Sequence, residues 1–293
     1  MLPDDFCVFI LSHGRPNKIY TLAALERSGY TGKIYIVIDD EDKTADAYKA
    51  KYGDRVVMFS KREIQAKHDD GINAGDRRSI FYARNACWDI ARKLGVSSFM
   101  QLDDDYTKFY YTVTDKRVVI HVNRLHVKQF DRLICAMLDF MKGAPIASVA
   151  LAQGGDFLGG LDAARNKSSI SRKCMNSFLC FTDRRFPFLG KINEDVTAYV
   201  DGGKRGLLFF TILDAGLLQK QTQSNTGGMT DIYRDSGTYV KSFYSVMWAP
   251  SCVKIGIIRG EANTRLHHSI DWPRAVPKIL SERYKKVADC KPV

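Results

Sequence analysis

The sequence predicts an α/β fold: one domain over residues 1–293 in which helices flank a mixed, mainly parallel sheet. Short apolar runs recur along the chain, and the early ones lead into stretches with helical spacing. Polar or acidic residues follow these early runs directly, and no long linker or internal repeat divides the chain. Strands that alternate with helices favour a parallel sheet, because a parallel connection needs a crossover that is usually a helix.

The first half of the chain supplies most of this alternation. Continuous apolar runs predict buried strands, and apolar residues at helical spacing predict amphipathic helices. Pro16 suits the first turn of a helix, and Gly95 is typical of a helix end. On these grounds we expect strands at 7–12, 33–38, 55–59 and 99–102, helices at 16–25, 44–52 and 79–94, and a polar, mobile loop at 61–78.

The second half continues with more loop. Residues 153–172 are glycine-rich and basic, which favours a flexible loop that contacts substrate. The basic tail from 281 onward is expected to be peripheral. We expect strands at 109–113, 118–122, 146–152, 178–181, 207–213 and 253–258, helices at 125–142, 196–200 and 229–248, and a polar loop at 219–228.

The composition is that of a globular protein with a strong basic surplus. The 293 residues are 45% hydrophobic and 26% charged, and the net charge is +11 with a pI near 9.2. A surplus of this size favours polyanionic partners such as nucleic acid or phosphorylated ligands. No apolar run approaches the roughly 20 residues of a membrane span, so we expect no membrane partner.

The cysteines and the start of the chain indicate a cytoplasmic location. The seven cysteines are scattered, odd in number and never spaced as CxxC, which favours free thiols in a reducing cytosol over a disulfide framework or a zinc ribbon. The first residues are acidic before their apolar run and lack the basic start of a signal peptide. No GxxxxGK[ST] or GxGxxG motif occurs, which disfavours a P-loop kinase or a Rossmann dehydrogenase.

Three consecutive aspartates follow the strand expected at 99–102. Asp103, Asp104 and Asp105 would lie at the carboxyl end of that strand, which is the edge where open α/β sheets bind ligands. Clustered carboxylates repel one another and suit Mg²⁺ or Mn²⁺, which in turn neutralise phosphates. The alternative is a solvated acidic turn after a strand.

Four further segments carry candidate polar groups, and each has a structural alternative. Residues 39–42 (DDED) could cap the next helix, and the pair 194–195 (ED) could form a helix N-cap. Arg84 could be a helix-surface arginine, and the pair 267–268 (HH) could belong to a surface turn before Trp272.

The order of these segments resembles a known class of enzymes. The stretches FILSHGRP (9–16), YIVIDDED (35–42), YARNACWDIA (82–91) and MQLDDDY (100–106) carry the resemblance. The chain resembles GT-A nucleotide-sugar glycosyltransferases and, more narrowly, the TET-associated glycosyltransferases of bacteriophages. The resemblance implies a GT-A-like, Rossmann-like fold. It also implies that 1–106 form a nucleotide-sugar-binding half and 107–293 an acceptor-binding half.

The resemblance assigns most of the candidate residues to the donor. It implies a UDP-sugar as donor substrate and Mn²⁺ or Mg²⁺ as cofactor. Asp104 would contact a ribose or sugar hydroxyl, and Arg84 would donate to phosphate or to the aspartate cluster. The remaining assignments are Ser12, His13 and Arg15 in the nucleotide pocket, Asp39 on uracil or ribose with Asp40 beside it, and Asp103, Asp105 and His267 or His268 on the metal.

The acceptor side rests on a carboxylate pair and on charge. By resemblance, Asp195 is the base that deprotonates the incoming hydroxyl, with Glu194 second; in a retaining reaction both would only position the acceptor. Basic residues in 165–185 could contact DNA phosphates, with nearby phenylalanines stacking a flipped base. The alternative is a solvated basic face over a phenylalanine core. The phenylalanines in question are Phe178, Phe181 and Phe186.

The predicted activity is the transfer of a sugar to DNA. The resemblance implies a metal-dependent transfer from a UDP-sugar to the hydroxyl of a 5-hydroxymethylpyrimidine, foremost 5-hydroxymethylcytosine, in phage DNA, within the host cytoplasm. One alternative is a glycosyltransferase of the same fold that acts on a glycan, a protein or a small molecule. Others are a nucleotidyltransferase and a DNA-binding module with an inactive site. The donor sugar, the stereochemistry and the oligomeric state stay open.

Overall fold

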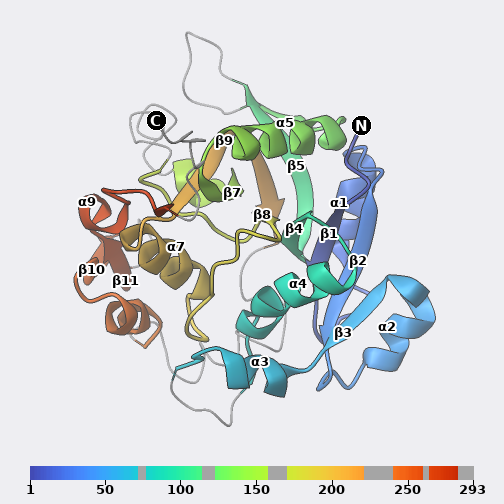
Figure 1. The fold of residues 1–293 in the computed structure, drawn as a ribbon, viewed down its shortest axis with the longest axis horizontal. Helices are drawn as coiled ribbons and strands as arrows, with labels where there is room; N and C mark the ends of the chain where they lie inside the picture. The colour runs from blue at the N-terminus through green and yellow to red at the C-terminus, as the bar shows by residue number, and fades with distance from the viewer. Residues whose placement is uncertain (72–76, 114–122, 158–169, 221–239, 260–263, 283–293) are drawn as a thin grey trace, which may run out of the picture.

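The computed structural model of the chain describes residues 1–71, 77–113, 123–157, 170–220, 240–259 and 264–282 (Figure 1). Its strands are β1 (Phe6–Leu11), β2 (Lys33–Asp39), β3 (Val56–Phe59), β4 (Ser98–Asp103), β5 (Tyr106–Val113), β6 (Asn123–His126), β7 (Ile146–Ala152), β8 (Phe178–Phe181), β9 (Leu208–Gln219), β10 (Val253–Arg259) and β11 (Thr264–Ile270). Its α-helices are α1 (Tyr20–Arg27), α2 (Ala45–Tyr52), α3 (Lys61–Lys67), α4 (Phe81–Lys93), α5 (Phe130–Gly143), α7 (Glu194–Lys204) and α9 (Trp272–Ala275). Residues 240–248 are also helical.

Within the described ranges, nine strands form one sheet in the order β3-β2-β1-β4-β8-β7-β9-β5-β6. Strands β1 to β4 are mutually parallel. Strand β8 is antiparallel to β4 and to β7, so β7 and its parallel neighbour β9 run in the direction of β1. Strand β5 is antiparallel to β9 and β6, which leaves only β5 and β8 reversed in this sheet. The predicted α/β class with a mixed, mainly parallel sheet is confirmed.

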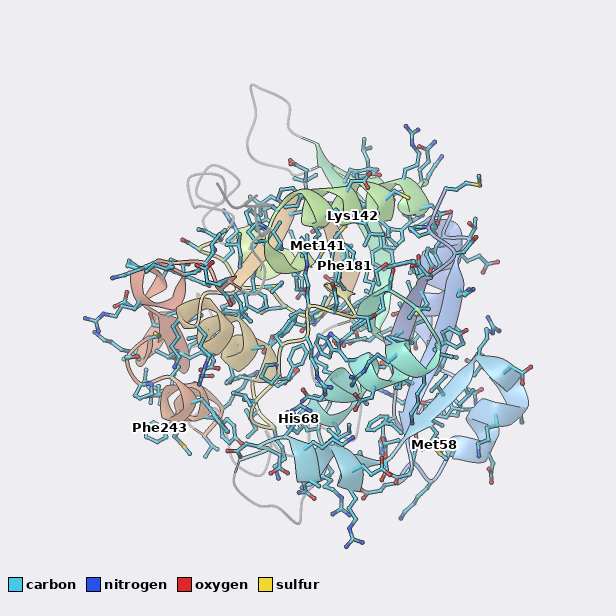
Figure 2. All side chains as sticks on the ribbon, in the orientation of Figure 1. Met58, His68, Met141, Lys142, Phe181 and Phe243 are labelled. Atoms are coloured by element: carbon cyan, nitrogen blue, oxygen red, sulfur yellow. The ribbon has the colours of Figure 1, made fainter. Side chains whose placement is uncertain are left out.

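Helices cover both faces of the sheet, as the alternation along β1 requires. Cys7, Phe9 and Leu11 point into a core shared with α4 and α7. Their neighbours in β1 point into a second core, which α1, α2 and α5 cover. Figure 2 shows the side chains filling the space between sheet and helices, with Phe181 inside and Met58 and Phe243 toward the periphery.

An aromatic cluster joins α4 to the sheet. The fully buried Trp88 lies edge-on to Phe99 of β4 and to Phe186, with ring centroids 5.5 and 5.0 Å apart. Edge-to-face contacts of this kind add to the gain from burial. The cluster therefore fixes α4, and the residues that α4 carries, against the strand that ends in the aspartates.

The cysteines of the described part are free thiols, as predicted. Burial raises the pKa of Cys7 and of Cys180 to about 12, so both stay protonated at neutral pH. No helix in the described ranges is long and apolar enough to cross a membrane.

Three sequence predictions are wrong at the level of single elements. Helix α1 begins at Tyr20 rather than at Pro16. Pro16 lies in a turn instead, and its carbonyl accepts a hydrogen bond from the Tyr52 hydroxyl of α2 at 2.6 Å. The loop expected at 61–78 contains helix α3. The helix expected from Leu125 begins at Phe130, since residues 123–126 pair with β5 as β6.

Several predictions fall partly or wholly outside the described residues. They are the strand at 118–122, most of the loops at 153–172 and 219–228, the start of the helix at 229–248, and most of the tail after 281. Strand β9 extends to Gln219, beyond the predicted end at 213.

Glycine at position 203 allows α9 to approach α7. A Cβ at Gly203 would overlap the carbonyl oxygen of Ala275, whereas a Cβ at Gly143, the last residue of α5, would meet nothing within 4 Å. An exposed helical Gly→Ala change usually stabilises by about 0.5–1 kcal/mol. We expect Gly203→Ala instead to lower the free energy of unfolding by about 1–3 kcal/mol in urea, because α9 must shift. Gly143→Ala is the matched control and should cause no loss; equal effects of the two changes would contradict this packing.

Candidate functional site

The three aspartates occupy the turn between β4 and β5, and α1 holds that turn. Thr21 Oγ1 donates to the carbonyl of Asp103 at 2.5 Å and accepts from the amide of Tyr106 at 3.0 Å. The Thr21 amide donates to the carbonyl of Asp104 at 3.3 Å. The turn is therefore fixed at the carboxyl edge of the sheet, beside the end of β1. Sequence reasoning missed Thr21, because nothing in the chain signals a contact of this range.

Asp104 is held by the segment after β1. Its Oδ2 accepts from Ser12 Oγ at 2.6 Å, and its Oδ1 lies 3.0 Å from the guanidinium of Arg15. Ser12 Oγ also lies 2.7 Å from the hydroxyl of Tyr48, a residue that sequence reasoning did not select. Burial raises the pKa of Asp104 to about 6, although Arg15 opposes the rise. Both oxygens of Asp104 thus have protein partners, and its contact with a ribose or sugar hydroxyl stays a prediction.

Arg84 of α4 joins Asp103 to Glu194. Its Nη2 donates to Asp103 Oδ1 and its Nε donates to Glu194 Oε1, each at 3.0 Å. The guanidinium is 1% exposed and lies 5.1 Å from the ring centroid of Phe178. Its Nη1 is buried and has no hydrogen-bond partner. Arg84 therefore contacts the aspartate cluster, while the contact with phosphate stays a prediction.

Asp105 carries the least compensated carboxyl of the turn. Its Oδ1 is buried without a hydrogen-bond partner. Burial, followed by the charges of Asp103 and Asp104, raises its pKa to about 7. A divalent cation would relieve this repulsion and would use the unpartnered oxygen, so Asp103 and Asp105 fit a Mg²⁺ or Mn²⁺ ion.

A second carboxylate group lies at the end of β2. His13 Nδ1 lies 2.7 Å from Asp39 Oδ2, and the buried Lys61 Nζ lies 3.0 Å from Asp39 Oδ1. Burial alone would raise the pKa of Asp39, but the hydrogen bond from His13 and the charge of Lys61 lower it below its ordinary value. An ionised Asp39 requires Nδ1 of His13 to be the donor, so it fixes the ring and presents Nε2 outward. Sequence reasoning missed Lys61, which it had placed in a loop.

The acidic segment 39–42 forms a local turn and does not cap the next helix, since the N-cap residue of α2 is Thr44 and has no side-chain cap hydrogen bond. Asp39 Oδ1 accepts from the amide of Glu41 at 3.1 Å, and Asp40 Oδ1 accepts from the amide of Lys61 at 3.0 Å. Asp42 accepts from the amide and hydroxyl of Thr44, the N-cap residue of α2. Asp40 is exposed, and its role in nucleotide binding stays a prediction.

Glu194 and Asp195 are the first residues of α7, where carboxylates complement the helix dipole. Asp195 Oδ1 accepts from the amide of Val196 at 2.7 Å. Burial, followed by the charge of Asp195, raises the pKa of Glu194 to about 7, although Arg84 opposes the rise. Burial raises the pKa of Asp103 as well, and the charge of Asp195 adds to that rise. The pair at the start of α7 is thus in electrostatic contact with the aspartate turn.

The two histidines lie on β11 of the two-stranded sheet that β10 and β11 form. Their rings are 4.1 Å apart, and the Lys173 ammonium lies 3.4 Å from Nε2 of each. Burial, followed by the charge of Lys173, lowers the pKa of His268 to about 2. Among the described residues, no group of three or more His, Cys, Asp or Glu side chains is arranged to hold a metal. The described residues do not bring His267 and His268 together with the aspartates, and their role as ligands stays a prediction.

The phenylalanines proposed to stack a flipped base are core residues. Phe178 and Phe186 are at most 1% exposed, and Phe181 is 8% exposed. Phe178 and Phe186 contact one another's rings, and Phe181 belongs to the core between α1, α2, α5 and the sheet, with the Arg184 guanidinium over its ring. The stacking prediction is wrong for these residues, and its alternative, a core assignment, holds.

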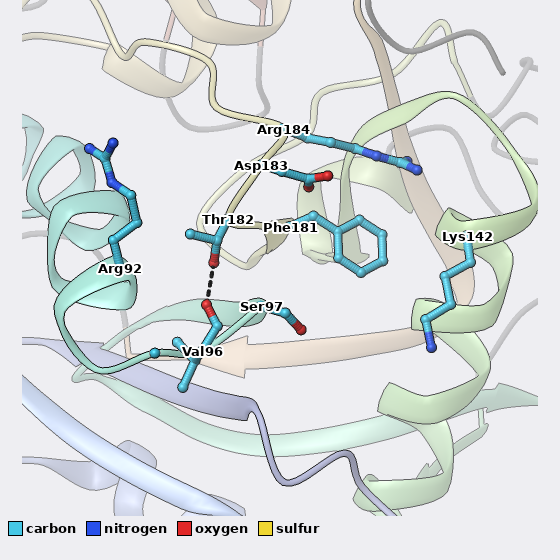
Figure 3. A pocket seen from close by; sticks show the side chains of 9 residues that line it. Arg92, Val96, Ser97, Lys142, Phe181, Thr182, Asp183 and Arg184 are labelled. Atoms are coloured by element: carbon cyan, nitrogen blue, oxygen red, sulfur yellow. Dashed lines mark hydrogen bonds between the residues drawn. The ribbon is translucent and has the colours of Figure 1, made fainter. Parts of the chain in front are cut away.

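A cavity of about 680 Å³ opens at the opposite edge of the sheet (Figure 3). It lies at the amino end of β4, where Thr182 Oγ1 donates to the carbonyl of Val96 at 2.7 Å. Arg92, Lys142 and Arg184 surround it. Strand β4 separates this cavity from the aspartate turn by about 17 Å, at roughly 3.3 Å per residue. The cavity is therefore distinct from the polar site at the carboxyl edge.

The fold and the site are those of an α/β protein with a cluster of carboxylates at the carboxyl edge of its sheet, the edge where open α/β sheets bind ligands. The chain matches the family TET-Associated Glycosyltransferase over residues 6–228. It belongs to that family and is a glycosyltransferase, as the resemblance of its motifs predicted. No curated protein matches the chain.

Solved structures with a similar arrangement are distant. Glucosyl-3-phosphoglycerate synthase from Mycobacterium tuberculosis, in complex with Mg²⁺ and UDP, is 9% identical with a TM-score of 0.46, covering 90% of this chain and 87% of that chain. Mannosyl-3-phosphoglycerate synthase from Rubrobacter xylanophilus is 12% identical with a TM-score of 0.44, covering 90% and 86%. At these values the assignment rests on the family match.

Arg84 should be essential for the stability of the site. Arg84→Met leaves the half-buried Asp103 and the buried Glu194 without a counter-charge, which costs about 3–5 kcal/mol. We expect a loss of that size in the free energy of unfolding, measured in urea at pH 7.5. Arg205→Ala is the control, because it removes an ion pair whose arginine side chain is 73% exposed, and it should cost under about 1 kcal/mol. Similar losses in both variants would contradict the buried bridge.

Asp105 should destabilise the metal-free chain as the pH rises. Its carboxyl titrates near pH 7 in the folded chain against an ordinary value of 3.8. Folding is therefore unopposed by this group below about pH 4, increasingly opposed between about pH 4 and 7, and opposed by a constant amount at higher pH. We expect Asp105→Asn to stabilise the chain at pH 8 but not at pH 4, in urea unfolding with a chelator present. Asp46→Asn, at a fully exposed side chain, is the control; a gain that does not vary with pH would contradict the titration.

Proposed function

We propose that this glycosyltransferase moves a sugar from a UDP-sugar to the hydroxyl of a 5-hydroxymethylpyrimidine, foremost 5-hydroxymethylcytosine, in DNA. The observation that carries the proposal is the Arg84 bridge. It joins Asp103, at the end of β4, to Glu194, at the start of α7. One site thus contains a carboxylate turn suited to a diphosphate with its metal and a carboxylate pair suited to an incoming hydroxyl.

The donor would lie against the ends of β1, β2 and β4. Asp103 and Asp105 would hold Mn²⁺ or Mg²⁺, which when bound neutralises charge on the diphosphate leaving group. Arg15, fixed by Asp104, adds positive charge beside the turn. His13, oriented by Asp39, offers a polar group to the nucleoside. These residues all belong to 1–106, which supports the proposed nucleotide-sugar-binding half.

The acceptor hydroxyl would be deprotonated by Asp195. Its Oδ1 is engaged with the Val196 amide, which leaves Oδ2 for the hydroxyl proton. Glu194 is less suited, because it is buried and bonded to Arg84. In this step the hydroxyl oxygen bonds to the anomeric carbon, the bond from that carbon to the diphosphate breaks, and UDP leaves. Asp195 takes the proton. Both carboxylates belong to 107–293, the proposed acceptor-binding half.

DNA as the acceptor is supported by charge and by the family. The chain carries a net charge of +11, and counter-charge to the phosphate backbone is the main source of affinity for DNA. The family that the chain belongs to is named for its association with TET, and the sequence resemblance implied hydroxymethylpyrimidines as acceptors. A phage origin would place the reaction in the host cytoplasm. A glycan, a protein or a small molecule is the alternative acceptor.

The test is transfer itself. We expect the chain, incubated with Mn²⁺, a panel of UDP-sugars and DNA that contains 5-hydroxymethylcytosine, to yield a glycosylated nucleoside by mass spectrometry. DNA with unmodified cytosine should yield none, and a chelator should abolish the product. Asp195→Asn should lower kcat by about 10²–10⁴-fold, the usual contribution of a general base, while UDP affinity is kept.

Asp183→Asn, a change at an exposed carboxylate beside the cavity at the opposite edge, is the matched control and should keep full activity. Release of UDP with another acceptor, and no adduct on any hydroxymethylated DNA, would refute the DNA proposal. Full activity of Asp195→Asn would refute the assignment of the base.

A further inference from the structure

Asn193, the residue before the carboxylate pair, has a left-handed backbone. Its φ of 55° and ψ of 41° lie in a region that non-glycine residues rarely adopt, although asparagine tolerates it. The residue is only 6% exposed. Its carbonyl accepts from the amide of Thr197 at 3.0 Å and from the hydroxyl of Thr197 at 3.1 Å. Asn193 therefore sets the direction in which α7 starts.

The side chain of Asn193 is anchored to another helix. Its Nδ2 donates to the carbonyl of Lys241 at 2.6 Å and to Ser245 Oγ at 2.9 Å. Both partners belong to the helix at 240–248, which Figure 1 shows below α7. A glycine could adopt the same backbone, but it would offer neither hydrogen bond.

The helix at 240–248 is itself held from a second side. Gly71 and Gly190 have φ values of +84° and +76°, and a Cβ on either would overlap Tyr244 or, at Gly190, also Trp248. The Tyr244 hydroxyl donates to the carbonyl of Asp70 at 3.0 Å. The helix at 240–248 is thus held in place, and the hydrogen bonds of Asn193 fix the start of α7 relative to that helix.

We propose that Asn193 is a positioning residue, which fixes Glu194 and Asp195 relative to Asp103 by linking α7 to the helix at 240–248. The inference rests on the proposed function, because it concerns the carboxylates assigned there to the acceptor hydroxyl. A misplacement of a reacting group by about 1 Å costs on the order of 10²-fold in rate. Asn193 directly precedes Glu194 and Asp195 in the chain, so the loss of its two anchors acts on the placement of both carboxylates.

The experiment compares transfer to hydroxymethylated DNA with hydrolysis of the UDP-sugar by water, which needs the same base but no DNA. Asn193→Gly keeps the backbone conformation accessible and removes both side-chain anchors. We expect kcat of both reactions to fall on the order of 10²-fold, with KM for the UDP-sugar and Kd for UDP unchanged. Ser245→Ala removes one anchor and should cause a smaller fall.

Arg205→Ala is the matched control, because it removes an ion pair with Asp201 at the other end of α7 and should leave kcat unchanged. An unaltered kcat in Asn193→Gly, an equal fall in Arg205→Ala, or a loss of UDP binding would each overturn the inference. A wild-type chain that hydrolyses UDP-sugars but modifies no DNA would refute the proposed acceptor alone. A wild-type chain inert with every donor would refute the proposed function, and the inference with it.

Discussion

The structure depends on one buried cation. Arg84 compensates Asp103, at the end of β4, and Glu194, which lies 110 residues further along the chain than Arg84. Buried carboxylates without a counter-charge are strongly unfavourable, so the edge of the sheet and the start of α7 can share a water-poor site only with such a partner. The planar guanidinium also sets the direction of each contact, which an ammonium group could not do. The aromatic contacts of α4 through Trp88 serve the same end, because they fix the helix that carries Arg84.

The other carboxylates at this edge of the sheet differ in how far nearby hydrogen-bond donors and positive charges compensate their own charge. Asp39 has two cationic or hydrogen-bonding partners and a lowered pKa, whereas Asp105 has a buried oxygen without a partner and a raised one. The contrast separates carboxylates that the protein satisfies by itself from one that would gain most from a ligand. It favours Asp105 over Asp104 as the partner of Asp103 in the proposed metal site.

The sequence was sufficient for elements whose pattern is local. Strands such as β7 and β8 match their predicted bounds, since a short continuous apolar run in a globular chain is typical of a buried strand. It was insufficient where a distant partner decides the conformation. Residues 123–126 pair with β5, and the turn at Pro16 is held by Tyr52. The local sequence at neither place therefore indicates the observed conformation. The site shows the same division. The aspartates and Arg84 came from motifs, whereas Thr21 and Lys61 act through contacts that only the folded chain reveals.

The reversed strand β8 has a consequence for how the chain could be divided. It pairs with β4 on the side away from β1, through residues 178–181. A fragment that ends near residue 106 would lack β8. The backbone N–H and C=O groups of β4 that pair with β8, among them those of Phe99 and Met100, would then be exposed without hydrogen-bond partners. Such an edge invites association between copies. The proposed donor and acceptor halves would therefore not be separable pieces, and truncation between them should yield insoluble protein rather than an independent donor-binding unit.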